Sequence, residues 1–142
     1  MPRGTSSVTD PPAVAETYVV DASLLVEVVI TRAGWRGVAE RIRNVALHAP
    51  AHVDVEVMSA LARLVRAGKL SGAQADQALG RFADAPITRH PLPDLVVGSW
   101  ARTGSLRVAD ALYVELAATL GTRVLTTDAR LSRASDLAEL VE

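Results

Sequence analysis

The chain has 142 residues and a formal net charge of −1; it is 49% hydrophobic, 22% charged and free of cysteine. This length suits one domain with a hydrophobic core, and the composition excludes a chain that is disordered throughout. The lack of cysteine excludes disulfides, thiolate zinc sites and a cysteine nucleophile. The small net charge excludes a polycation that attracts nucleic acid by its overall field.

No apolar run approaches the roughly 20 residues of a membrane-spanning helix. With no secretory signal pattern either, the expected compartment is the cytoplasm.

The chain is expected to begin with a disordered leader. Residues 1–16 contain three prolines among glycine, serine and threonine and show no hydrophobic periodicity. A single domain is then predicted over residues 17–142. Its first element is a short buried strand at 17–20, followed by a helix over 22–31. The residue between these two elements is Asp21.

Strands and helices are predicted to alternate along the rest of the chain. Apolar spacings of three and four residues, a capping box opened by Ser71 and a C-cap at Gly121 mark the helices. Further helices are predicted over residues 34–44, 52–67, 71–83, 94–102 and 107–120. Further strands are predicted at 45–50, 86–91 and 122–128, and residues 128–140 hold a short helix and a terminal element of undecided type.

This alternation predicts the fold class. Strands separated by helices pair in parallel through βαβ crossovers, which cover a sheet on both sides. We therefore expect an α/β fold with a central, mainly parallel sheet flanked by helices on both faces. Ligands of such sheets bind beyond the carboxyl ends of the strands.

Four acidic residues stand out by their positions in these elements. Asp21 and Asp128 each follow a predicted strand and precede a helix, and Glu56 and Asp110 lie in first helical turns beside apolar faces. Taken singly, each has an ordinary structural role, because aspartate is a favoured N-cap and first-turn acids interact with the helix dipole. Taken together, they are expected at one edge of the sheet.

Four neighbouring carboxylates would repel one another unless a cation or a shared proton relieves them. A divalent ion is the natural remedy, and hard oxygen ligands suit Mg²⁺ or Mn²⁺ better than zinc. Because Mg²⁺ also accepts phosphate oxygens, the implied chemistry is phosphoryl transfer or hydrolysis.

Four segments carry a resemblance to a known family. They are VVDAS (19–23), VEVMSAL (55–61), VADALYVELA (108–117) and LTTD (125–128). In this order they resemble the four acidic motifs of PIN-domain ribonucleases, especially the VapC toxins of toxin–antitoxin systems. The similarity runs from about residue 17 to residue 135.

The resemblance implies a single PIN-like domain that acts as a Mg²⁺- or Mn²⁺-dependent endoribonuclease and as the toxin of a toxin–antitoxin pair. It also implies an RNA substrate, a homodimer, and a cognate antitoxin that fills the acidic groove. The catalytic acids and metal ligands would be Asp21, Glu56, Asp110 and Asp128. Ser23 and Thr126 match the family's hydroxyl residues and are expected to hydrogen-bond these carboxylates, although turn and cap roles fit them equally well.

Other polar residues are weaker candidates. Glu27 interrupts an apolar run but does not follow a strand, and Asp54 fits a solvated first-turn acid. Three histidines, at 48, 52 and 90, are too scattered in the sequence to predict a metal cluster. The candidate phosphate contacts, each equally compatible with a solvated helix face, are Arg32, Arg36, Arg41, Arg43 and Arg130.

Three alternative classes share some of these features. A receiver domain needs an acid pair near its first strand and a lysine at a late strand end, whereas the only lysine is Lys69, in mid-chain. A haloacid-dehalogenase-like domain needs Asp-x-Asp, but Ser23 occupies the third position. A non-catalytic PIN-like domain that binds protein or RNA remains open.

Overall fold

A five-stranded parallel sheet forms the centre of the computed structural model, which describes residues 4, 15–30 and 36–142. Most of the expected leader, and Arg32, lie outside these residues. The strand order is β3-β2-β1-β4-β5, and each neighbouring pair is parallel. The strands are β1 (Thr17–Val20), β2 (Ala46–Pro50), β3 (Ile87–His90), β4 (Val124–Thr126) and β5 (Ala138–Leu140).

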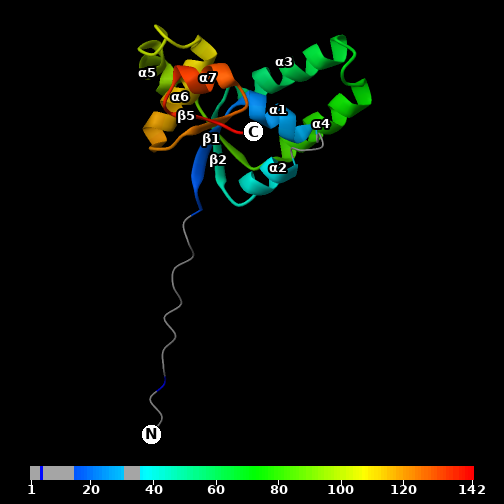
Figure 1. Ribbon diagram of the computed structural model, residues 1–142, viewed down its shortest axis with the longest axis horizontal. Helices are drawn as coiled ribbons and strands as arrows, with labels where there is room; N and C mark the ends of the chain where they lie inside the picture. Colours follow the sequence, from blue (N-terminus) through cyan, green and yellow to red (C-terminus); the bar gives the residue numbers. More distant parts are fainter. Residues whose placement is uncertain (1–3, 5–14, 31–35) are drawn as a thin grey trace.

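Two groups of helices connect the strands. The segments from β1 through β2 to β3 carry α1 (Ala22–Val29), α2 (Arg36–Ile42), α3 (Val53–Arg66) and α4 (Gly72–Asp84). The segment from β3 to β4 carries a 3₁₀ turn, η1 (Leu92–Leu95), with α5 (Val96–Trp100) and α6 (Val108–Leu120), and α7 (Ala129–Ala134) follows β4. Figure 1 shows α3 and α4 on one side of the molecule and α5 and α6 on the other.

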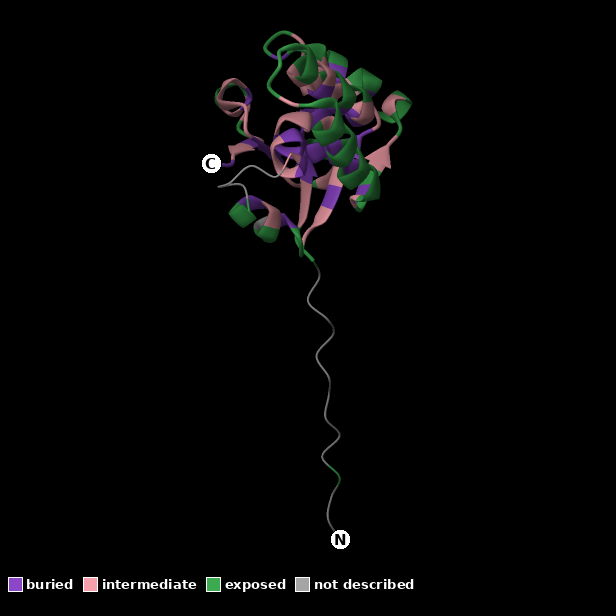
Figure 2. Cartoon of the chain, turned by 90° about the vertical axis from the view of Figure 1, so that its right-hand side faces the viewer, coloured by how far each residue is buried: buried purple, intermediate pink, exposed green. Residues whose placement is uncertain are grey.

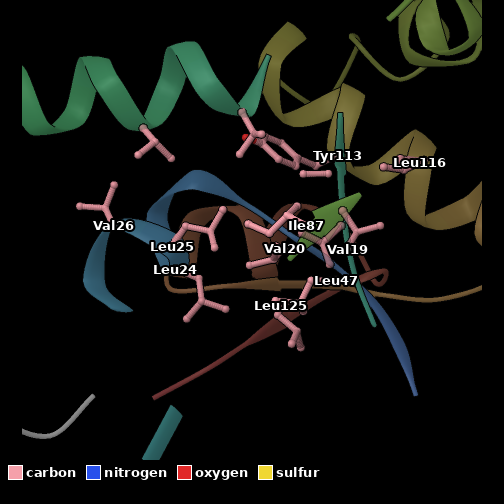
Figure 3. Close-up of a cluster of buried hydrophobic side chains, with 14 of the residues drawn as sticks. Val19, Val20, Leu24, Leu25, Val26, Leu47, Ile87, Tyr113, Leu116 and Leu125 are labelled. Atoms are coloured by element: carbon pink, nitrogen blue, oxygen red, sulfur yellow. The ribbon is translucent and has the colours of Figure 1, made fainter. Parts of the chain in front are cut away.

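The sheet is covered on both faces. Val19 and Val20 are neighbours in β1 and therefore point to opposite faces, yet neither exposes any surface. Figure 3 shows Leu24 and Leu25 of α1 and Leu116 of α6 in the same hydrophobic cluster. In Figure 2 the buried residues gather in the sheet and on the inner helix faces, and the exposed residues lie on the outer helix faces.

The predicted fold class is confirmed, and most predicted elements are found within three residues of their expected bounds. The capping box of Ser71 with Gln74 is present. The helix expected over 94–102 is divided into η1 and α5, with Pro91 and Pro93 flanking its start. The undecided terminal element is the edge strand β5, which pairs with β4. Among the described residues, no helix is long and apolar enough to cross a membrane.

Replacing Gly121 or Gly80 by alanine should change the stability of the protein in opposite directions. Gly121 ends α6 with a φ of 66°, where a Cβ is strained, whereas Gly80 lies inside α4 with open space where an alanine methyl group would project. Gly121→Ala should therefore lower the free energy of unfolding by about 1–2 kcal/mol. Gly80→Ala should raise it by up to about 1 kcal/mol. Urea unfolding measures both changes, and a Gly121→Ala variant as stable as the wild type would contradict the assigned C-cap.

Candidate functional site

The candidate site lies where the chain reverses its direction of travel across the sheet. From β1 the chain moves outward to β2 and β3, then crosses back over the sheet to enter β4, which pairs with β1. The carboxyl ends of β1 and β4 therefore lie side by side, the usual position for ligands of open parallel sheets. Asp21 directly follows β1 and Asp128 lies two residues beyond β4.

A pocket of about 450 Å³ opens at this edge of the sheet. All four predicted acids line it: Asp21, Glu56, Asp110 and Asp128. The structure thus brings together four carboxylates from four different segments of the chain. Ser23 and Glu27 of α1 also line the pocket. Thr126 does not line it but hydrogen-bonds to Asp21, which does.

Asp21 is the most buried of the four acids, with 5% of its surface exposed. The pKa of this carboxyl is raised to about 6, mainly by burial and to a smaller extent by the charge of Asp110. Hydrogen bonds from Thr126, Ser23 and the Leu24 amide act in the opposite direction. The raised pKa means that the surroundings of Asp21 do not fully compensate its negative charge.

The two hydroxyl residues donate the expected hydrogen bonds, both to Asp21. The Ser23 hydroxyl donates to Oδ1 at 2.7 Å, and the Thr126 hydroxyl donates to Oδ2 at 2.5 Å. Thr126 Oγ1 also accepts from the Asp128 amide at 3.0 Å, and Ser23 Oγ accepts from the Thr127 amide at 3.1 Å. The ends of β1 and β4 are therefore linked through side chains that also orient Asp21.

Asp21 and Asp128 also serve as N-caps. Asp21 Oδ1 accepts from the Leu24 amide at 3.1 Å, and Asp128 Oδ1 accepts from the Arg130 amide at 2.9 Å. The capping role and the pocket role coexist, because each carboxylate has a second oxygen. Asp128 Oδ2 faces the side chain of Arg130.

Glu56 is oriented by two aromatic neighbours. The Tyr113 hydroxyl donates to Glu56 Oε1 at 2.7 Å, and His52 Nε2 lies 3.3 Å from the same oxygen. Figure 3 shows Tyr113 reaching from α6 towards the start of α3. Burial, followed by the charge of Glu56, raises the pKa of Tyr113, which keeps its hydroxyl protonated as a donor.

His52 connects this pair to the backbone of α6. Its Nε2 lies 3.1 Å from the Ala109 carbonyl oxygen, which only accepts hydrogen bonds, so Nε2 carries the proton. The other ring nitrogen, Nδ1, is buried and has no partner among the described residues. The ring also contacts Tyr113, with centroids 4.7 Å apart.

Arg130 joins the remaining two acids. Its Nη2 donates to Asp110 Oδ2 at 2.7 Å and to Asp128 Oδ2 at 2.9 Å. These contacts hold the pKa of Arg130 above its usual range, and the contact with Asp110 has the larger effect. The pocket offers the hard oxygen donors that Mg²⁺ or Mn²⁺ binds, although no three acids or histidines in the described part of the chain are already arranged around one ion position.

Sequence reasoning identified the acids but missed several of their neighbours. Tyr113 and His52 contact Glu56, and Arg63 and Arg107 line the pocket. Helical spacing was the available signal: Tyr113 follows Asp110 by three residues, and Arg63 follows Glu56 by seven. Of the described arginines predicted as phosphate contacts, Arg130 lines the pocket, whereas Arg36 and Arg43 do not line it.

Asp54, His48 and His90, weaker candidates for the site, make contacts outside the pocket. Asp54 is a first-turn acid of α3 that pairs with Arg89 at 2.7 Å, away from the pocket. His48 and His90, distant in the sequence, lie on neighbouring strands with ring nitrogens 2.8 Å apart. Burial and the neighbouring His90 lower the pKa of His48. The structure thus pairs two of the histidines that sequence spacing had separated.

The chain is similar to known proteins in sequence and in fold. The sequence profile of the PIN domain family matches residues 18–137. Ribonuclease VapC3 of Mycobacterium tuberculosis is 49% identical over 130 residues, which cover 91% of this chain and 93% of the relative. The crystal structure of PAE2754 from Pyrobaculum aerophilum matches with a TM-score of 0.65 and 23% identity, covering 96% of this chain and 91% of that one.

A second solved structure has the same fold. VapC20 of Mycobacterium tuberculosis, described as a toxin that cleaves the sarcin–ricin loop, matches with a TM-score of 0.61 and 18% identity, covering 83% of this chain and 95% of that one. The chain belongs to the PIN-domain family. Within that family it is a relative of the VapC-type ribonucleases.

The raised pKa of Asp21 predicts how stability depends on pH. Because the folded-state pKa of about 6 exceeds the ordinary value of 3.8, the folded state binds this proton more tightly than the unfolded state does. The stability contributed by this group is present below about pH 4 and lost as the pH rises through 6. The difference between these two pKa values corresponds to at most about 3 kcal/mol.

Asp21→Asn removes this titration. In EDTA at pH 8 the variant should have a higher free energy of unfolding than the wild type, and near pH 4 the difference should disappear. Urea unfolding at both pH values measures the effect, with Asp54→Asn as a control carboxylate outside the pocket. A variant that is destabilised equally at both pH values would contradict the account.

Proposed function

We propose that this protein is a metal-dependent endoribonuclease and the toxin of a toxin–antitoxin pair. The observation that carries the proposal is the convergence of Asp21, Glu56, Asp110 and Asp128 in one pocket at the carboxyl ends of β1 and β4. The buried, incompletely compensated charge of Asp21 supports a site built to receive a cation. The extensive similarity to a protein named as a ribonuclease supports RNA as the substrate.

In this proposal Asp21, Asp110 and Asp128 hold Mg²⁺ or Mn²⁺, and Glu56 acts on the water beside the ion. Ser23 and Thr126 fix the orientation of Asp21. The bound ion would lower the pKa of a coordinated water molecule. It would also stabilise the negative charge on the phosphate oxygens. Glu56, oriented by Tyr113, accepts a proton from the attacking water. The pocket also has arginines to contact the flanking phosphates: Arg63 and Arg107.

The proposed partners follow from the same assignment. A cognate antitoxin would block the pocket. Both proteins would act in the cytoplasm, a compartment in which proteins do not depend on disulfides, and this chain has no cysteine.

We assign the homodimer interface to the α5 patch, which consists of Val96, Val97, Trp100 and Val108. These side chains expose between 55% and 84% of their surface, and such an apolar patch suits a protein interface.

One observation favours the non-catalytic alternative, a PIN-like domain that only binds protein or RNA. Arg130 already pairs with Asp110 and Asp128, and no described set of three acids or histidines surrounds a common ion position. The two functions differ in whether RNA is cleaved.

Cleavage of mixed RNA tests the proposal. Pure protein with Mg²⁺ or Mn²⁺ should cut RNA, EDTA should abolish the reaction, and Asp21→Asn or Glu56→Gln should lower the rate by at least about a hundredfold, as expected for loss of a general base or metal ligand. Asp54→Asn, in the same helical turn as Glu56 but paired with Arg89, is the matched control. Failure to cleave any RNA in the presence of either metal would favour the binding domain, and cleavage that survives Asp21→Asn would overturn the site assignment.

The α5 patch generates a prediction about assembly. Val97→Glu combined with Trp100→Glu should convert the dimer into a monomer, because two charges would be buried in an apolar contact. Val55→Glu is the matched control, since Val55 is an exposed valine on α3. Light scattering after size-exclusion chromatography measures the mass. A dimer that persists in the double variant but dissociates in the control would assign the interface to α3.

A further inference from the structure

One nitrogen of Arg130 connects two of the four acids. Nη2 lies 2.7 Å from Asp110 Oδ2 and 2.9 Å from Asp128 Oδ2, so a single –NH₂ group donates one hydrogen bond to each carboxylate. Both oxygens come from residues that the proposed function assigns to the metal. A positive group therefore already lies between two negative ligands.

This arrangement relieves charge repulsion within the pocket. Asp110 and Asp128 are the acids nearest to Arg130, with side chains 17% and 34% exposed, and bringing two carboxylates together in a partly buried site is unfavourable without a positive partner. Glu56 instead accepts a hydrogen bond from the Tyr113 hydroxyl, and His52 Nε2 lies 3.3 Å from the same oxygen. Arg130 is thus the counterion for one half of the acid set.

The side chain of Arg130 is also able to leave. It is 38% exposed, and the pairs it makes are contacts of one guanidinium nitrogen, not a two-nitrogen fork with one carboxylate. An arginine at a pocket rim can move into solvent at small cost compared with a buried one. The contact is therefore strong enough to order the acids and weak enough to be exchanged.

We propose that Arg130 is a positioning residue that holds Asp110 and Asp128 when no divalent ion is bound and competes with that ion for them. The inference rests on the proposed function, because it assumes that these two acids are metal ligands. It goes beyond that function by making metal affinity depend on a residue that is not itself a ligand. Metal binding then includes the release of Arg130 from both carboxylates.

Mn²⁺ binding tests this inference without measuring activity. The free Mn²⁺ signal in electron paramagnetic resonance gives the dissociation constant for the wild type and for Arg130→Gln. Removing the competing cation should tighten binding about tenfold, equivalent to about 1.4 kcal/mol. Arg133→Gln, on the exposed side of the same helix, should leave it unchanged. Arg130→Lys, which keeps the charge, should give an intermediate affinity.

Thermal unfolding provides a second readout. In EDTA, Arg130→Gln should unfold at a lower temperature than the wild type because two carboxylates lose their partner, and saturating Mn²⁺ should raise its unfolding temperature by more than it raises that of the wild type. Equal or weaker Mn²⁺ binding by Arg130→Gln, in a protein whose wild type binds Mn²⁺, would overturn this inference alone. Absence of Mn²⁺ binding in both proteins would overturn it together with the metal dependence of the proposed function.

Discussion

The parallel pairing of β1 with β4 is the constraint on which the site depends. Val19 is opposite Val124 and Val20 is opposite Leu125, and the Asp21 amide continues the ladder by donating to the Leu125 carbonyl at 3.2 Å. This register brings residues separated by more than a hundred positions to one edge of the sheet. Without it, Asp21 and Thr126 would not meet, and each aspartate after a strand would be only a helix cap.

The register concentrates negative charge, and the surrounding residues only partly offset it. Ser23 and Thr126 donate to Asp21 and Tyr113 donates to Glu56, yet burial still raises the pKa of Asp21. Arg130 compensates the other two acids. A site of this kind costs stability in the absence of a cation. If the site binds a divalent ion as we propose, relief of that cost would add to the binding free energy. Stability and the proposed activity are therefore linked through one set of carboxylates.

The sequence predicted the features that depend on local pattern. Apolar spacing identified the strands and most helices, and aspartates directly after strands, together with acids in first helical turns, indicated the edge where the site lies. Features that depend on tertiary contacts were not predictable in this way. Strand β5 has only three residues, too few for a recognisable pattern. The sharing of Arg130 between two acids depends on the tertiary fold, which brings Arg130 of α7 within hydrogen-bond distance of Asp110 of α6.

The central claim is that Asp21 carries a negative charge that its neighbours leave partly uncompensated and that a bound cation relieves. The titration of Asp21 tests this claim most directly. ¹³C nuclear magnetic resonance of the labelled side chain gives its pKa with and without Mg²⁺. We predict a pKa near 6 in EDTA, and a pKa below its ordinary value of 3.8 in saturating Mg²⁺. A carboxyl that titrates near 3.8 in EDTA, or whose titration does not respond to Mg²⁺, would contradict this claim.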